Sequence, residues 1–198
     1  MRTRLLLTAL LTPQMLTRYY PTLVLSLFLS LSPFRLSAQA IRPAQVRDDL
    51  TFLQKALYRG HPGVFHYTPR DSMDALFDRL RAEVPTDSVS QDQVHILVRR
   101  AVAAVRDGHT SVLTPFYNEQ TRVMPIMAQI IGNQVFVWRN YSGDTTLRRG
   151  LEIRSVNGIP AAELLSQCRE LCFRDGFNLS FPDVIASVSF ARFVRLLY

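Results

Sequence analysis

The sequence predicts an α+β fold, in which a subdomain of three helices precedes a small module of strands with a helix of its own. Two observations support this prediction. Apolar residues recur with the helical period of 3.6 between residues 46 and 105, and short runs of β-branched and apolar residues replace that pattern between residues 110 and 160. A turn-type Asn157-Gly158 pair then leads into another helical pattern. Strands grouped after helices favour the α+β class over an alternating α/β class.

Residues 1–40 have the layout of a secretory signal peptide. They contain four arginines and no acidic residue, an apolar run over residues 23–31, and the small-residue ending Ser37-Ala38-Gln39-Ala40. The run is shorter than the roughly 20 residues of a spanning helix, so we favour a cleaved signal over a membrane anchor. Cleavage is expected after Ala40, translation begins at Met1 or Met15, and the mature protein is exported to the periplasm or the extracellular space.

Three helices are expected next. The first ends at Gly60, before His61-Pro62, and the second has Thr68 as N-cap, Pro69 at its first position and its end at Pro85. The third starts with the capping-box pair Ser90 and Gln93 and runs to Asp107-Gly108. Their inward residues are expected to pack as one bundle: Val46, Leu50, Leu53 and Leu57; Met73, Leu76, Phe77 and Leu80; Val94, Leu97, Val98, Ala101, Val102 and Val105.

The strand patterns begin directly after His109. A first strand is expected at residues 110–113, and residues 123–131 and 135–138 are expected to form a hairpin about Gly132-Asn133. Residues 150–160 are read as one further strand ending in an Asn-Gly turn, after which Pro160 opens a helix. That helix carries Leu164, Leu165, Cys168, Leu171 and Cys172.

Charge and cysteine content exclude some functions. Removing the leader takes four arginines from a net charge of +7 and leaves +3, with basic residues scattered among acids, so no nucleic-acid partner is expected. Cys168 and Cys172 lie four residues apart on one expected helix, a spacing awkward for a disulfide, and two thiols are too few for a zinc site. We expect both on a buried helical face, and no cofactor.

His109 is the leading candidate for chemistry, because the turn Asp107-Gly108 should fix its backbone and its ordinary pKa near 6.5 suits proton transfer at neutral pH. The alternative is a histidine that caps the turn or binds backbone. Asp107 either orients the imidazole or ends the helix and stabilises the turn, and the turn role is favoured. Ser111 lies near the site but is not named as a nucleophile.

His61 and His66 raise the question of a metal site together with His109. Their spacing matches no helical ligand motif and no carboxylate cluster completes a set, so no metal is expected. His61-Pro62 is expected to fix the exit of the first helix, since a residue before proline is driven away from helical geometry.

Four passages together resemble the N-terminal part of the C-terminal-processing, or tail-specific, serine peptidases, in their tricorn-core-like branch. They are residues 49–62, Asp107-Gly108-His109-Thr110, Met124-Pro125-Ile126 and residues 150–160. The resemblance implies a helical subdomain with the first strand of the peptidase core at 41–117, a PDZ-like domain at 118–176, and the start of a truncated catalytic core at 177–198. Since the chain stops within an apolar pattern, we expect a fragment with the catalytic core largely missing.

The resemblance implies that His109 is the general base for a serine supplied later in the chain. Such a serine becomes nucleophilic only with a base within about 2.6–3.2 Å. The expected function is therefore peptide-bond hydrolysis by an exported serine endopeptidase, for which this stretch alone is inactive. The alternative is a non-catalytic module of the same fold that binds a peptide or other ligand. The expected partner is a peptide or protein substrate, and no membrane span is expected after signal cleavage.

Overall fold

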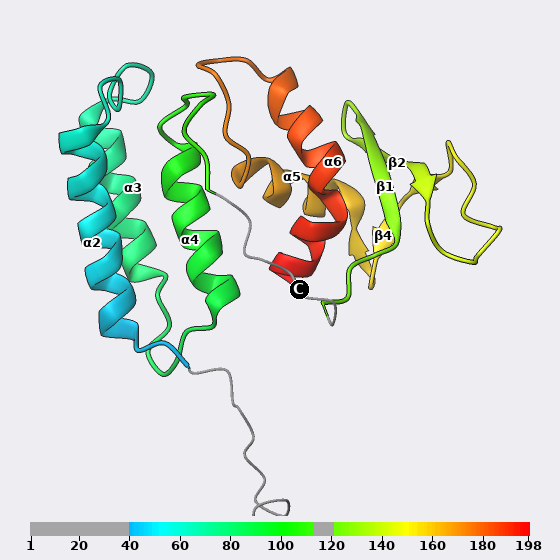
Figure 1. Ribbon diagram of the computed structural model, residues 1–198, viewed down its shortest axis with the longest axis horizontal. Helices are drawn as coiled ribbons and strands as arrows, with labels where there is room; N and C mark the ends of the chain where they lie inside the picture. The colour runs from blue at the N-terminus through cyan, green and yellow to red at the C-terminus, as the bar shows by residue number, and fades with distance from the viewer. Residues whose placement is uncertain (1–39, 113–120) are drawn as a thin grey trace, which may run out of the picture. The chain divides into compact units, whose positions relative to one another are not determined.

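The computed structural model describes residues 40–112 and 121–198. The expected signal peptide lies almost wholly outside these residues. The first part consists of the helices α2 (Pro43–Gly60), α3 (Arg70–Ala82) and α4 (Gln91–Ala103), which Figure 1 shows in blue to green. Among the described residues, no helix combines the length and the apolar character needed to cross a bilayer.

The expected three-helix bundle is confirmed by a single hydrophobic cluster drawn from α2, α3 and α4. Met73, Phe77 and Leu80 have no exposed surface, and Val46 and Leu50 are 1% exposed. The capping box of α4 is also present, because Ser90 Oγ accepts the Gln93 N–H and the Gln93 side chain accepts the Ser90 N–H. The buried faces of α2 and α3 therefore match the periodicity of the sequence, whereas α4 also buries His95 and Arg99, and the predicted inward residues Val98 and Val102 lie outside this cluster.

The predicted cap of the second helix is wrong. Pro69 is the N-cap of α3 and no side chain caps it, while the Thr68 hydroxyl donates instead to the carbonyl oxygen of Ala104 at 2.6 Å. A tertiary contact with the end of α4 thus takes the hydroxyl that the local pattern assigned to α3.

The strands β1 (Ile126–Ile131) and β2 (Gln134–Asn140) form the predicted antiparallel hairpin. Its two-residue turn begins with Gly132 at φ +59°, a conformation that glycine adopts without steric cost. β3 (Glu152–Ile153) adds to β2 and completes a three-stranded sheet in the order β1-β2-β3.

Residues 150–160 do not form the single strand that was predicted. They divide into β3, β4 (Ser155–Val156) and β5 (Ile159–Pro160), and β4 pairs with β5 about the Asn157-Gly158 turn. The break falls at Arg154, whose carbonyl accepts the N–H of Ala161 at 2.9 Å. This hydrogen bond closes the separate hairpin of β4 and β5, which therefore does not continue the pairing of β3 with β2. The predicted strand at 110–113 is not formed over residues 110–112, and Leu113 lies outside the described residues.

The helices α5 (Ala161–Glu170) and α6 (Ser180–Leu197) pack with the hairpin around a second hydrophobic cluster. Phe190 and Leu164 are fully buried in it, and α6 runs along β1 (Figure 1). The Ser187 hydroxyl accepts the N–H of Ile130 at 3.0 Å, which ties α6 to the sheet. Because α6 shares this core, the boundary expected between residues 176 and 177 lies within one packed unit.

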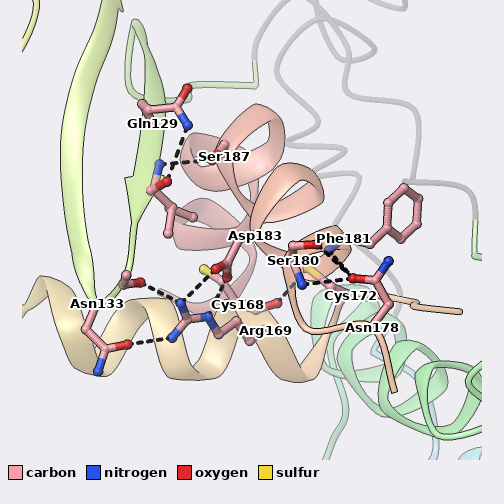
Figure 2. Close-up of polar contacts among 12 residues, drawn as sticks. Gln129, Asn133, Cys168, Arg169, Cys172, Asn178, Ser180, Phe181, Asp183 and Ser187 are labelled. Carbon is pink, nitrogen blue, oxygen red and sulfur yellow. Dashed lines mark hydrogen bonds and ion pairs between the residues drawn. The ribbon is translucent and has the colours of Figure 1, made fainter. Parts of the chain in front are cut away.

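Arg169 joins three elements of this second core (Figure 2). Its guanidinium donates to Asp183 on α6 at 2.7 Å, and to the Gly132 carbonyl and Asn133 side chain in the hairpin turn. At the start of α6, the Asn178 carboxamide oxygen accepts the N–H groups of Ser180 and Phe181, orphan donors of the first helical turn. These polar contacts fix the ends of the elements while apolar residues fill the space between them.

The predicted burial of the cysteines is confirmed, but the helix is shorter than predicted, because α5 ends at Glu170 and Cys172 lies beyond it. Both are buried and free, and the Cys172 thiol donates to the Cys168 carbonyl at 3.2 Å. Burial raises the pKa of each thiol to about 12, so both remain protonated at neutral pH.

Candidate functional site

The turn that carries His109 follows the end of α4. Arg106 adopts a left-handed conformation with φ +58°, and its carbonyl accepts the N–H of Gly176 at 2.9 Å. Asp107 Oδ1 then accepts the His109 N–H at 2.6 Å, and the Asp107 carbonyl accepts the Thr110 N–H at 3.2 Å. The predicted role of Asp107 in stabilising the turn is therefore present, and the backbone of His109 is fixed.

A second Asp-Gly pair packs against this turn. A Cβ added to Gly108 would lie 3.3 Å from the Cβ of Asp175, so a larger residue at position 108 would require Asp175 to shift by a few tenths of an ångström. Gly176 has φ +57°, and a Cβ there would lie 2.9 Å from the Tyr67 ring. The turn is thus held between the loop after α2 and the loop between α5 and α6.

The imidazole of His109 points into solvent, with a side-chain exposure of 103%. Its Nδ1 lies 3.9 Å from Asp107 Oδ1, too far for a hydrogen bond. Asp107 therefore holds the backbone of His109 but not its ring. No described side chain covers the imidazole, which is therefore open to solvent.

His61, rather than His109, is the histidine that side chains and backbone hold in place. Its Nδ1 accepts the N–H of Gly63 at 3.1 Å, while its Nε2 lies 2.9 Å from Thr110 Oγ1 and 3.4 Å from Asp107 Oδ2. The His61 side chain is 13% exposed. The structure brings His61 to the predicted turn, a contact that sequence spacing does not reveal.

The carboxylate of Asp107 is electrostatically stabilised in this setting. The hydrogen bond from the His109 N–H lowers its pKa, and the nearby imidazoles of His61 and His109 lower it further against a desolvation effect that raises it. Asp107 is therefore an anion at neutral pH, and it accepts hydrogen bonds rather than exchanging protons with either histidine.

The other sequence candidates do not join this site. His66 is exposed and its ring contacts Tyr67 edge-on, and Ser111 is exposed. Within residues 40–112 and 121–198, no group of three or more His, Cys, Asp or Glu side chains is arranged to hold a metal ion.

A buried pair, His95 and Arg99, was not identified from sequence. Arg99 Nε donates to His95 Nε2 at 2.8 Å, and its other nitrogens donate to the carbonyls of Leu171 and Val112. Desolvation and the Arg99 charge lower the pKa of His95 to about 4. Through these bonds the pair joins α4 to Leu171, at the end of α5, and to Val112, three residues after His109.

The described residues also form two clefts. One of about 440 Å³ is lined mainly by apolar side chains at the start of β1, on β2 and over β3–β4, among them Met124, Val137, Leu151 and Ile153. The other, of about 280 Å³, lies at the ends of α4 and α5 and is lined by Arg79, Arg100, Arg169 and Arg174 together with Glu170. Arg79, Arg100 and Arg169 stand in the last turns of α3, α4 and α5, where a cation complements the negative end of a helix dipole.

No model of a known protein family matches this chain, and no curated protein matches it.

Proposed function

We propose that this chain is the base-bearing part of an exported serine-type peptidase, in which His109 accepts the proton of a serine supplied from outside the described residues. The observation that carries the proposal is an imidazole fully exposed on a turn whose backbone is fixed by Asp107. A general base must be able to reach the proton that it removes, and the fixed backbone limits where the exposed ring can lie. The proposed reaction is acyl transfer to the serine followed by hydrolysis.

The apolar cleft supports a peptide substrate. It is lined by residues 151–156, which include the short strands β3 and β4. An extended peptide can add to such a strand by main-chain hydrogen bonds while apolar side chains occupy the cleft. The same cleft supports the second candidate, a non-catalytic module that binds a peptide or another apolar ligand without hydrolysing it.

Peptide hydrolysis by the product of the complete gene tests the first candidate. His109→Ala is expected to lower kcat by about 10²- to 10⁴-fold, the usual contribution of a general base. His66→Ala is the matched control, because it removes another exposed histidine that lies outside the turn. Unchanged hydrolysis in His109→Ala contradicts the proposed role.

A fluorophosphonate probe separates the two candidates. The complete gene product is expected to be labelled at one serine, and the 198-residue chain is expected to remain unlabelled. A complete product that binds peptide but takes no label is a binding module.

Export is a separate part of the proposal and rests on the composition of residues 1–40. When the chain is produced with these residues in a secreting host, the mature protein is expected to begin at Ile41. N-terminal sequencing of the recovered protein decides the point, and an intact leader contradicts it.

A further inference from the structure

The contacts of His61 determine which of its ring nitrogens carries the proton. The Gly63 N–H donates to Nδ1 at 3.1 Å, so Nδ1 presents a lone pair. The neutral ring therefore carries its hydrogen on Nε2, where Thr110 Oγ1 at 2.9 Å and the Asp107 carboxylate at 3.4 Å are the acceptors. In this form His61 donates to Thr110 and cannot remove its proton, which excludes a His61–Thr110 nucleophile pair.

We propose that His61 is a positioning residue for His109. It contacts Asp107 on one side of His109 and Thr110 on the other, and so fixes both ends of the short turn that displays the imidazole. The inference rests on the proposed role of His109 as a base. It assigns to the loop after α2 a part in the site that lies 48 residues further along the chain.

The hydrogen bonds of the His61 ring are not needed to end α2. The backbone N–H of His61 already donates to the Leu57 carbonyl at 3.0 Å and caps the helix. The ring reaches across to the turn instead. Catalysis is sensitive to such support, because a misplacement of about 1 Å can lower a rate by about 10²-fold.

Hydrogen exchange of the His109 amide tests the inference in the 198-residue chain. His61→Phe keeps the ring volume but removes the donor, and His61→Gln keeps an N–H donor near the position of Nε2. We expect the His109 amide, followed by NMR, to exchange about tenfold faster in His61→Phe, and within about twofold of wild type in His61→Gln and in the control His66→Phe. Unchanged exchange in His61→Phe overturns the inference.

A second variant, Thr110→Val, tests whether faster exchange reflects the lost hydrogen bond or a general loss of stability. Thr110→Val removes the acceptor at the other end of the hydrogen bond and leaves the His61 ring in place, and faster exchange at His109 is expected here as well. Equal acceleration in His61→Gln and His61→Phe overturns the inference, because the donor would then be irrelevant.

Kinetics of the complete gene product provide the catalytic readout. His61→Phe is expected to lower kcat by about 10²-fold with KM within twofold, and His61→Gln to restore most of it. Lowered kcat with an unchanged His109 amide overturns the inference and leaves the proposed function standing. A wild-type protein without peptidase activity overturns the proposed function, and the exchange data then decide only whether His61 holds the turn.

Discussion

The two hydrophobic clusters of the described chain differ in the elements that form them. The bundle cluster is built from three helices that follow one another in the chain. The second cluster combines a hairpin, β3 and two helices, with Arg169 and Ser187 hydrogen-bonding between them. Both clusters are joined by hydrogen bonds between residues far apart in the chain, since Arg47 of α2 donates to the carbonyls of Arg81 and Val84. The difference therefore lies in whether helices pack on helices alone or on a sheet as well.

α4 belongs to both clusters. Leu97 and Ala101 face the bundle, whereas Ile96 packs against the second cluster and the His95–Arg99 pair bonds to the end of α5. One helix thus presents an apolar face to one side and a partly polar face to the other.

The largest expected effects come from truncating the centre of each cluster. Phe77→Ala and Phe190→Ala each remove a side chain without exposed surface, and each is expected to lower the free energy of unfolding by about 3–5 kcal/mol. Native-state hydrogen exchange should show that Phe77→Ala weakens α2 and α3 most and Phe190→Ala weakens β1 and α6 most. Identical losses throughout would break the distinction between the clusters.

A pH titration probes the polar face of α4. The lowered pKa of His95 means that the unfolded chain binds an extra proton between about pH 6.5 and pH 4, so stability falls as the pH is lowered through this range. The loss due to this residue is at most about 3 kcal/mol. His95→Gln, which keeps an acceptor for Arg99, should flatten the urea-denaturation profile over that range, and a profile unchanged by this variant would contradict the assignment.

Arg169→Ala tests the polar ties of the second cluster. Loss of the bonds to Asp183 and the hairpin turn is expected to cost about 1–2 kcal/mol of unfolding free energy, since the pair is partly exposed. Arg154→Ala is the control, because its guanidinium pairs with Glu152 at a largely exposed position and should change stability by less than about 0.5 kcal/mol. Equal losses of unfolding free energy in Arg169→Ala and Arg154→Ala would show that the contacts of Arg169 contribute no specific stability.

The smallest expected effect is at the start of the shared helix. Ser90→Ala removes half of the capping box of α4 and should cost about 1 kcal/mol, compared with almost nothing for Ser72→Ala on the exposed face of α3. Because α4 belongs to both clusters, thermal denaturation should show reduced stability in probes of each. A loss confined to the bundle would show that α4 serves one cluster more than the other.

Much of the fold could be predicted because local signals act on local structure. The 3.6-residue period placed the buried faces of α2 and α3, and the Gly132-Asn133 pair placed the hairpin. Predictions failed where a distant group competes for a hydrogen bond. The Ala104 carbonyl takes the Thr68 hydroxyl, and the Ala161 N–H takes the Arg154 carbonyl and divides the expected strand.

The candidate site divides in the same way. The sequence alone determined a fixed turn at residues 107–109 and a histidine on it, because an aspartate side chain can bind the backbone two residues further on. Only the tertiary structure decided that Asp107 holds the backbone of His109 rather than its ring, and that His61 reaches the same turn. The reason is the separation of the interacting residues along the chain. The geometry of the turn is set by neighbouring residues, whereas the His61 contacts exist only because the bundle brings the ends of α2 and α4 together.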